Sequence, residues 1–216
     1  MMKMLKQNKW KLLISSLIIL LPIAAGLILW EKLPEQMAIH WGLNGDPDSF
    51  AGRAVPVFVL PLVLLALQWV GMLVTARDPK NKDQTKKAIN LIFWICPVIS
   101  LLAGAAIYFA AFGKEFQLSM LVPAVLGIMF IVIGNYMPKC KQNRTLGIKI
   151  KWTLENEENW NATHRFAGKL WVAGGFALLL CCFLPQSALP FVVLIAPAVM
   201  VVPPVVYSYR YYRRKK

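Results

Sequence analysis

The sequence predicts an all-α membrane protein, a bundle of six transmembrane helices with both termini in the cytoplasm. Of the 216 residues, 58% are hydrophobic and only 16% are charged, and the charges are clustered between long apolar runs. A helix needs about 20 mainly apolar residues to cross the hydrocarbon core of a membrane, and six runs have roughly this length. The runs lie at residues 12–30, 54–76, 88–112, 118–137, 168–184 and 187–209.

The interiors of the six runs contain no Asp, Glu, Lys, Arg or His. A charge at the bilayer centre costs about 2.5–3.5 kcal/mol on insertion scales, so this composition supports the assignment. Ion-coupled transporters usually keep a carboxylate within the membrane, so the pattern disfavours that class. The first run also has features of a secretory signal peptide, but its apolar residues continue to Trp30 without a polar cleavage region.

The basic residues predict the orientation of the bundle. Of the 24 Lys and Arg residues, all but Lys32, Arg53 and Lys114 flank the runs on the side that carries both termini. Cytoplasmic flanks of membrane helices carry an excess of Lys and Arg, so this side is the cytoplasmic one. Such flanks also account for the net charge of +14, so no direct binding of nucleic acid is expected.

No internal repeat or low-complexity linker divides the chain, and we expect two halves of three helices each, residues 1–113 and 114–216. Small residues predict close helix packing at Gly127, Gly134 and Gly174. Gln68 lies inside the second run, where we expect an interhelical hydrogen bond.

The last run contains Pro190, Pro197, Pro203 and Pro204. Because proline removes a backbone donor and crowds the preceding turn, we expect this helix to be kinked or broken. Broken helices line the binding sites of some transporters, so a small transporter or exporter of a peptide or amphiphile is the alternative function.

The outer loop, residues 31–53, carries turn signals and several polar side chains. Residues 37–41 alternate weakly, Asn44-Gly45 is a turn dipeptide, and Asp48 is a possible helix cap. We expect an ordered extracellular loop. His40, Asp46 and Asp48 can form turns, contact an external partner or make a metal or catalytic cluster, but their spacing matches no established ligand set. With no nucleophile beside an evident base, the sequence disfavours an enzyme and predicts no cofactor.

The inner loop, residues 138–169, predicts an ordered cytoplasmic structure. Apolar residues alternate from Leu146 to Trp152, which indicates a short extended segment. Thr153 is placed to cap a helix that continues into the fifth run. Within that helix, we expect His164 to pack or to form a hydrogen bond rather than to bind a ligand.

These two loops resemble known sequences. The block GNYMPKCKQNRTLGIKIKWTLENEENWNATHRFAGKLW, residues 134–171, resembles the signature of the SdpI family of bacterial membrane proteins. The segment LPEQMAIHWGLNGDPDSFAGR, residues 33–53, looks like the domain of unknown function that commonly precedes it. Relatives commonly have the sequence GIRTPWTL where this chain has GIKIKWTL. Lys149 therefore takes the place of an arginine; it keeps the positive charge but lacks the guanidinium group.

The resemblance implies a membrane immunity protein of the bacterial cell membrane, which gives resistance to a secreted, membrane-active killing peptide. It also implies a signalling role, in which the protein holds a transcriptional repressor at the inner face. Extracellular residues are then expected to contact the peptide and cytoplasmic residues the repressor. The first set is His40, Trp41, Asn44, Asp46 and Asp48, and the second is Asn143, Arg144, Lys149, Trp152, Thr153, Trp160, His164 and Arg165.

Overall fold

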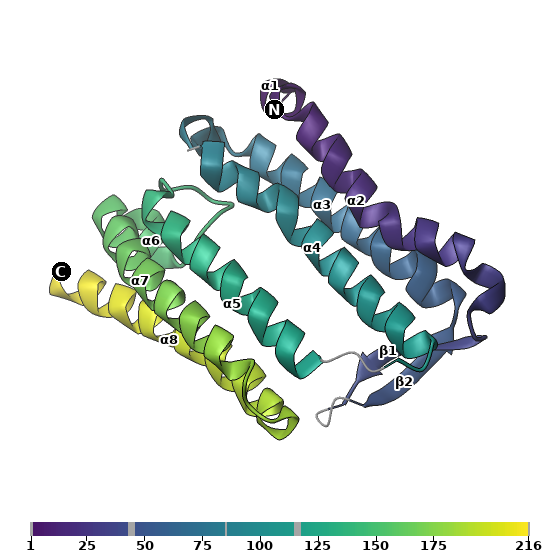
Figure 1. Ribbon diagram of the computed structural model, residues 1–216. Coiled ribbons are helices and arrows are strands. Elements are labelled where there is room, and N and C mark those ends of the chain that lie inside the picture. The colour runs from purple at the N-terminus through teal and green to yellow at the C-terminus, as the bar shows by residue number, and fades with distance from the viewer. Residues whose placement is uncertain (1, 43–45, 85, 115–117, 216) are drawn as a thin grey trace. The chain divides into compact units, whose positions relative to one another are not determined.

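A computed structural model describes residues 2–42, 46–84, 86–114 and 118–215, and most of them are helical (Figure 1). The chain forms two compact units. Unit 1 contains Met1–Arg77 and Asn90–Leu118, and unit 2 contains Asp78–Ile89 and Ser119–Lys216. The helices are α1 (Met2–Gln7), α2 (Lys9–Ile28), α3 (Leu60–Arg77), α4 (Lys86–Ala111), α5 (Leu118–Tyr136), α6 (Lys151–Glu155), α7 (Glu157–Cys181) and α8 (Leu189–Arg214).

Four segments of the described chain are long and apolar enough to cross a membrane. They are Lys9–Ile28, Val55–Arg77, Ile89–Ala111 and Met120–Lys139, and they coincide with the first four predicted runs. The last two predicted runs overlap α7, which has 25 residues, and α8, which has 26. At about 1.5 Å per residue, both helices exceed the thickness of a hydrocarbon core, about 30 Å.

Unit 1 is built from α2, α3 and α4, which are joined by buried polar contacts. The Gln68 side-chain amide donates to Ser15 Oγ at 2.8 Å and to the Phe93 carbonyl at 3.2 Å, so the predicted interhelical hydrogen bond is confirmed. Further along, Ser100 donates to the Ile19 carbonyl at 2.8 Å, and Tyr108 donates to the Pro22 carbonyl at 2.6 Å. Side chains of α4 thus hold the middle of α2.

The outer loop forms a β-hairpin, so the all-α prediction is wrong in this segment. Strand β1 (Gln36–Trp41) pairs antiparallel with β2 (Pro47–Gly52), and Met37 lies opposite Ala51. The alternation of residues 37–41 beside a turn dipeptide favours strand pairing over a helix. Asp48 lies within β2 and does not cap a helix.

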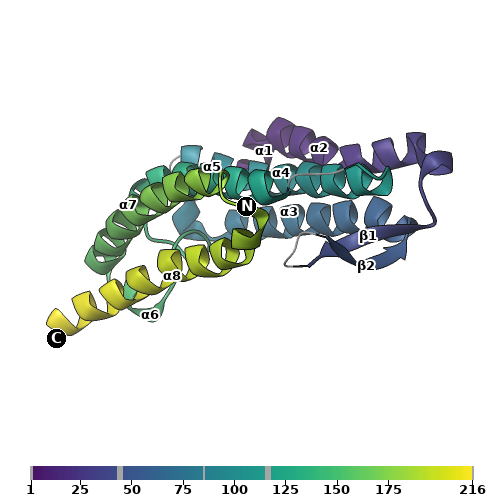
Figure 2. The ribbon, with the colours of Figure 1, turned by 60° about the horizontal axis from the view of Figure 1, so that its bottom comes forward.

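In unit 2, α7 packs along α8 (Figure 2). Glycines bring α5 against α7, as predicted. A Cβ added to Gly127 would lie 2.7 Å from the Gly175 carbonyl oxygen, and one added to Gly134 would lie 2.9 Å from that of Gly168. Only residues without a side chain fit at these two crossings.

Two predictions about helix ends and breaks differ from the structure. Helix α8 is continuous through its prolines, so the break is not found. Pro204 leaves the Met200 carbonyl without its helical donor, and Trp171 Nε1 donates to this carbonyl at 2.9 Å. Thr153 lies inside α6, where it accepts a hydrogen bond from the Ile150 amide. The cap of α7 is Asn156, which accepts from the Asn159 amide at 2.8 Å. As expected, that helix continues without interruption into the fifth run, where it ends at Cys181.

Candidate functional site

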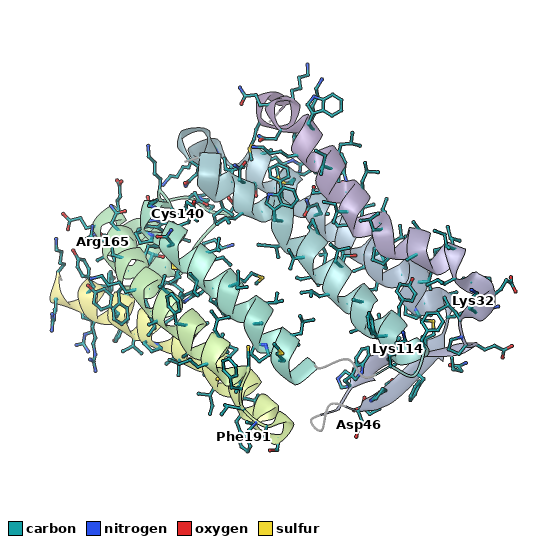
Figure 3. The ribbon with its side chains drawn as sticks, in the orientation of Figure 1. Lys32, Asp46, Lys114, Cys140, Arg165 and Phe191 are labelled. Atoms are coloured by element: carbon teal, nitrogen blue, oxygen red, sulfur yellow. The ribbon has the colours of Figure 1, made fainter. Side chains whose placement is uncertain are left out.

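The hairpin is attached to the end of unit 1 by apolar side chains. Leu33 and Met37 are buried together with Val57 and Ile107, and Trp41 packs against this cluster. In Figure 3, Asp46 of the hairpin lies at the same end of the unit as Lys32 and Lys114. All three labelled residues belong to connections that the charge pattern predicts to be extracellular.

The predicted peptide-contacting residues lie on this hairpin, except that Asn44 falls outside the described residues. His40 Nδ1 lies 2.6 Å from Asp48 Oδ1, and both side chains are exposed. Asp46 is exposed, and Trp41 is half-buried. In the described part of the chain, no group of three or more His, Cys, Asp or Glu side chains could hold a metal ion. The arrangement offers an oriented polar pair on an exposed ribbon.

Arg53 holds the base of the hairpin, a role that the sequence analysis missed. Its guanidinium donates to the carbonyls of Trp30 and Leu33 at 3.0 and 3.2 Å and lies 4.6 Å from the centre of the Trp30 ring. Arg53 is a lone basic residue between the polar loop and an apolar run, and this position could have indicated its role from the sequence.

In the inner loop, Asn143 organises a tight turn. Its side-chain amide donates to the carbonyls of Lys141 and Leu146 at 2.8 and 3.1 Å. Its side-chain oxygen accepts from the amides of Thr145 and Leu146 at 2.8 and 2.6 Å. Because the fully buried side chain satisfies both its donor and its acceptor capacity, it fixes the path of the chain.

His164 ties this turn to α7. Its Nδ1 lies 2.8 Å from the Trp160 carbonyl, so Nδ1 carries the proton and Nε2 accepts from the Ile148 amide at 3.0 Å. The imidazole also stacks on the Trp160 ring, with the ring centres 4.0 Å apart. Burial lowers the pKa of His164 to about 4, although the bond to the Trp160 carbonyl opposes this shift. The ring is therefore neutral at physiological pH, in the packing and hydrogen-bonding role expected from the sequence.

Trp160 and Thr153 complete the buried interior of the loop. Trp160 Nε1 donates to the Cys140 carbonyl at 2.8 Å. Thr153 Oγ1 lies 2.7 Å from the Ile148 carbonyl, to which it donates. Burial raises the pKa of the Cys140 thiol, against a smaller lowering by its contact with Asn143, so the thiol stays protonated.

A second segment, residues 78–84, is hydrogen-bonded to the inner loop. The Arg144 amide donates to Asp78 Oδ2 at 2.7 Å, and Asn81 Nδ2 donates to Thr145 Oγ1 at 2.6 Å. Gln84 exchanges hydrogen bonds with the backbone of Lys141. These contacts join residues 57 to 66 positions apart, and the sequence carries no local pattern that reveals them.

The predicted cytoplasmic site residues thus fall into two groups. Asn143, Thr153, Trp160 and His164 are fully buried and hold the loop together. The others are accessible: Arg144, Lys149 and Arg165 are exposed, and Trp152 is half-buried against Tyr209, with ring centres 4.9 Å apart. A partner can reach the second group, on a surface whose shape is set by the first.

Comparisons with known proteins match the region that contains the hairpin and the region that contains the inner loop. Residues 139–208 match the SdpI/YfhL protein family, and residues 17–65 match a domain of unknown function, DUF1648. The chain is 26% identical over 205 residues to the immunity protein SdpI of Bacillus subtilis (strain 168), an alignment that covers 94% of this chain and 97% of the relative. No solved structure matches the chain significantly.

Proposed function

Since residues 139–208 belong to the SdpI/YfhL protein family, we propose that this chain is a membrane immunity protein that protects its cell from a secreted, membrane-active killing peptide. The observation that carries the proposal is the end-to-end similarity to an immunity protein, which spans 94% of this chain and 97% of the relative. The matched residues 17–65 contain the hairpin, and the matched residues 139–208 contain nearly all of the inner loop, so both loops lie in regions that match known families.

The proposal includes six membrane spans with both termini in the cytoplasm. Four candidate spans support it directly, and the lengths of α7 and α8 are compatible with two more. The distribution of basic residues supports the orientation. Within unit 2, Figure 3 shows Cys140 and Arg165 at one end and Phe191 at the other, as expected if the inner loop and the α7–α8 connection face opposite sides.

The hairpin is the proposed contact for the peptide. His40 and Asp48 form an exposed, hydrogen-bonded pair; such a pair contributes little to stability, and its side chains are accessible to an external ligand. Exposed Ile39 and Phe50 add apolar surface to the same ribbon. A membrane-active peptide presents both polar and apolar side chains, so such a ribbon fits its chemistry.

The inner loop is the proposed site of a signalling response, in which a cytoplasmic transcriptional repressor is held at the membrane. Its accessible residues Arg144, Lys149 and Arg165 would make that contact. The transport alternative depended on a broken last helix, and α8 is continuous from Leu189 to Arg214, so that argument for transport is removed.

Survival of a peptide-sensitive bacterium that lacks an immunity gene tests this function. Cells that express the chain should survive culture fluid from a peptide-secreting strain better than cells with an empty vector. Lys32→Ala, an exposed change at the same end of unit 1, should protect as well as the unchanged protein. Absence of protection by a membrane-inserted protein would contradict the proposal, and protection that disappears when the proton gradient is collapsed would favour transport.

A further inference from the structure

The end of unit 2 that carries the inner loop has a strongly basic surface. We call this surface the basic rim; its residues are Lys139, Lys141, Arg144, Lys149, Lys151, Arg165 and Lys169 of the loop and the start of α7, with Arg210, Arg213 and Arg214 of α8. All of these side chains are exposed. In the part of the chain that the structure describes, no carboxylate forms an ion pair with them, whereas Lys215 pairs with Glu158. The charges of the rim are therefore available to an anionic partner.

The backbone that carries the rim is fixed before any partner binds. Asn143 holds the turn that precedes Lys149, and the Arg144 amide is bound to Asp78. The Lys149 ammonium itself donates to the Thr145 carbonyl at 3.1 Å. A surface whose backbone is already ordered loses less conformational entropy when it binds a ligand.

Aromatic and apolar side chains lie among the basic residues. Trp152 packs against Tyr209, and Phe166 stacks on Tyr207 with ring centres 4.8 Å apart. Leu154 is exposed on α6 between Lys151 and the start of α7. Trp and Tyr gather at the level of lipid headgroups, and a basic surface with exposed apolar residues is typical of contact with an anionic membrane.

We propose that the basic rim binds the phosphate groups of anionic phospholipids in the inner leaflet. This inference rests on the membrane topology proposed above, and it adds a lipid class as a ligand of the inner face. Each Lys or Arg near an anionic bilayer strengthens binding by roughly fivefold. Neutralising three residues of the rim should therefore weaken the preference for anionic lipid by roughly a hundredfold.

The experiment uses the full chain, purified in detergent and incubated with vesicles of equal parts phosphatidylglycerol and phosphatidylcholine. The lipids that remain bound after re-isolation are measured by native mass spectrometry. The test variant combines Arg144→Gln, Lys149→Gln and Lys151→Gln. One control combines Lys32→Gln and Lys114→Gln, outside the rim, and a second keeps the charges with Arg144→Lys, Lys149→Arg and Lys151→Arg.

The unchanged protein and both controls should retain phosphatidylglycerol in preference to phosphatidylcholine, and the test variant should lose most of that preference. Equal preference in the test variant, at an unchanged melting temperature, would overturn the proposal. Loss of the cellular signalling response with unchanged lipid retention would assign the rim to an acidic protein partner and would also overturn it. The assay contains no killing peptide, so its failure is distinct from a failure of the immunity function.

Discussion

The backbone of Gly147 lies directly against the imidazole of His164. Gly147 has a φ of +96°, a left-handed conformation that favours glycine, and a Cβ at this position would overlap His164 Nε2. The next amide, that of Ile148, donates to the same nitrogen at 3.0 Å. The absence of a side chain at Gly147 therefore permits the hydrogen bond that attaches the inner loop to α7.

Replacing Gly147 with alanine should destabilise the protein. The left-handed backbone and the overlap with His164 together should lower the free energy of unfolding by about 2–4 kcal/mol. Thermal unfolding in detergent measures this loss. Gly71→Ala is the matched control, because a Cβ at Gly71 meets nothing within 4 Å, and it should be neutral or slightly stabilising. Equal stabilities of the two variants would contradict the steric argument.

Stability should fall in mild acid because of His164. Its pKa is about 4 in the folded protein and 6.5 in an unfolded chain, so between these values the unfolded state binds the extra proton. The contribution of neutral His164 to the free energy of unfolding is complete above about pH 6.5. It is lost as the pH falls toward 4, by about 3 kcal/mol in total. Unfolding measured across this range should show a smaller loss in His164→Gln than in the unchanged protein. The same loss in both proteins would exclude His164 as its source.

The sequence predicts the helices better than it predicts the loops. Runs of apolar residues place α2 to α5 within a few residues, because the membrane constrains both length and composition. Gln68 could be assigned to an interhelical bond because a lone amide in an apolar run needs a partner. The hairpin was missed as a pair of strands because the alternation of residues 37–41 is weak.

The inner loop shows why part of the candidate site could not be predicted. Its signature residue Asn143 looks like a surface contact in a list of polar side chains, but the structure buries it. Asp78, Asn81 and Gln84 were not recognised because their partners lie more than 50 residues away. Thr153 carries a capping side chain, but it acts as the third residue of α6 rather than at the start of α7.

Trp160→Phe should measure how much one buried hydrogen bond contributes to the free energy of unfolding. The change keeps an aromatic ring but leaves the Cys140 carbonyl without its indole donor, and an unsatisfied buried acceptor costs about 1–3 kcal/mol. Chemical unfolding in mixed micelles would measure the difference from the unchanged protein. Trp10→Phe, at a residue that is 66% exposed, should change the stability little. A similar loss in the two variants would show that the indole donor contributes nothing specific.

Gln68→Leu should cost less than Trp160→Phe, although both remove buried hydrogen bonds. Bonds between membrane helices contribute about 0.6 kcal/mol on average, and the Gln68 side-chain oxygen has no partner among the described residues. Leucine removes that buried oxygen and fills a similar volume, so we expect a loss below about 1 kcal/mol. A loss of several kcal/mol in the same unfolding assay would instead show that Gln68 is a principal attachment between α2, α3 and α4.

The exposed pair of His40 and Asp48 gives the sharpest test of the peptide-contacting surface. If the two side chains act as one unit, His40→Ala and Asp48→Ala should each lower the tolerated amount of killing peptide by about tenfold, the equivalent of about 1.4 kcal/mol. The double variant should lose no more than either single variant, because the second change removes a partner that is already lost. Stability should be unchanged, since exposed pairs contribute little to it.

Gln36→Ala is the control for this pair, because Gln36 is also exposed on β1 but lies at the base of the hairpin. It should protect fully in the same survival assay, with equal amounts of each variant in the membrane. Full protection by both single variants would remove the pair from the contact surface. Additive losses, a hundredfold in the double variant, would mean that His40 and Asp48 contact the peptide independently, so the 2.6 Å bond between them would not be needed for recognition.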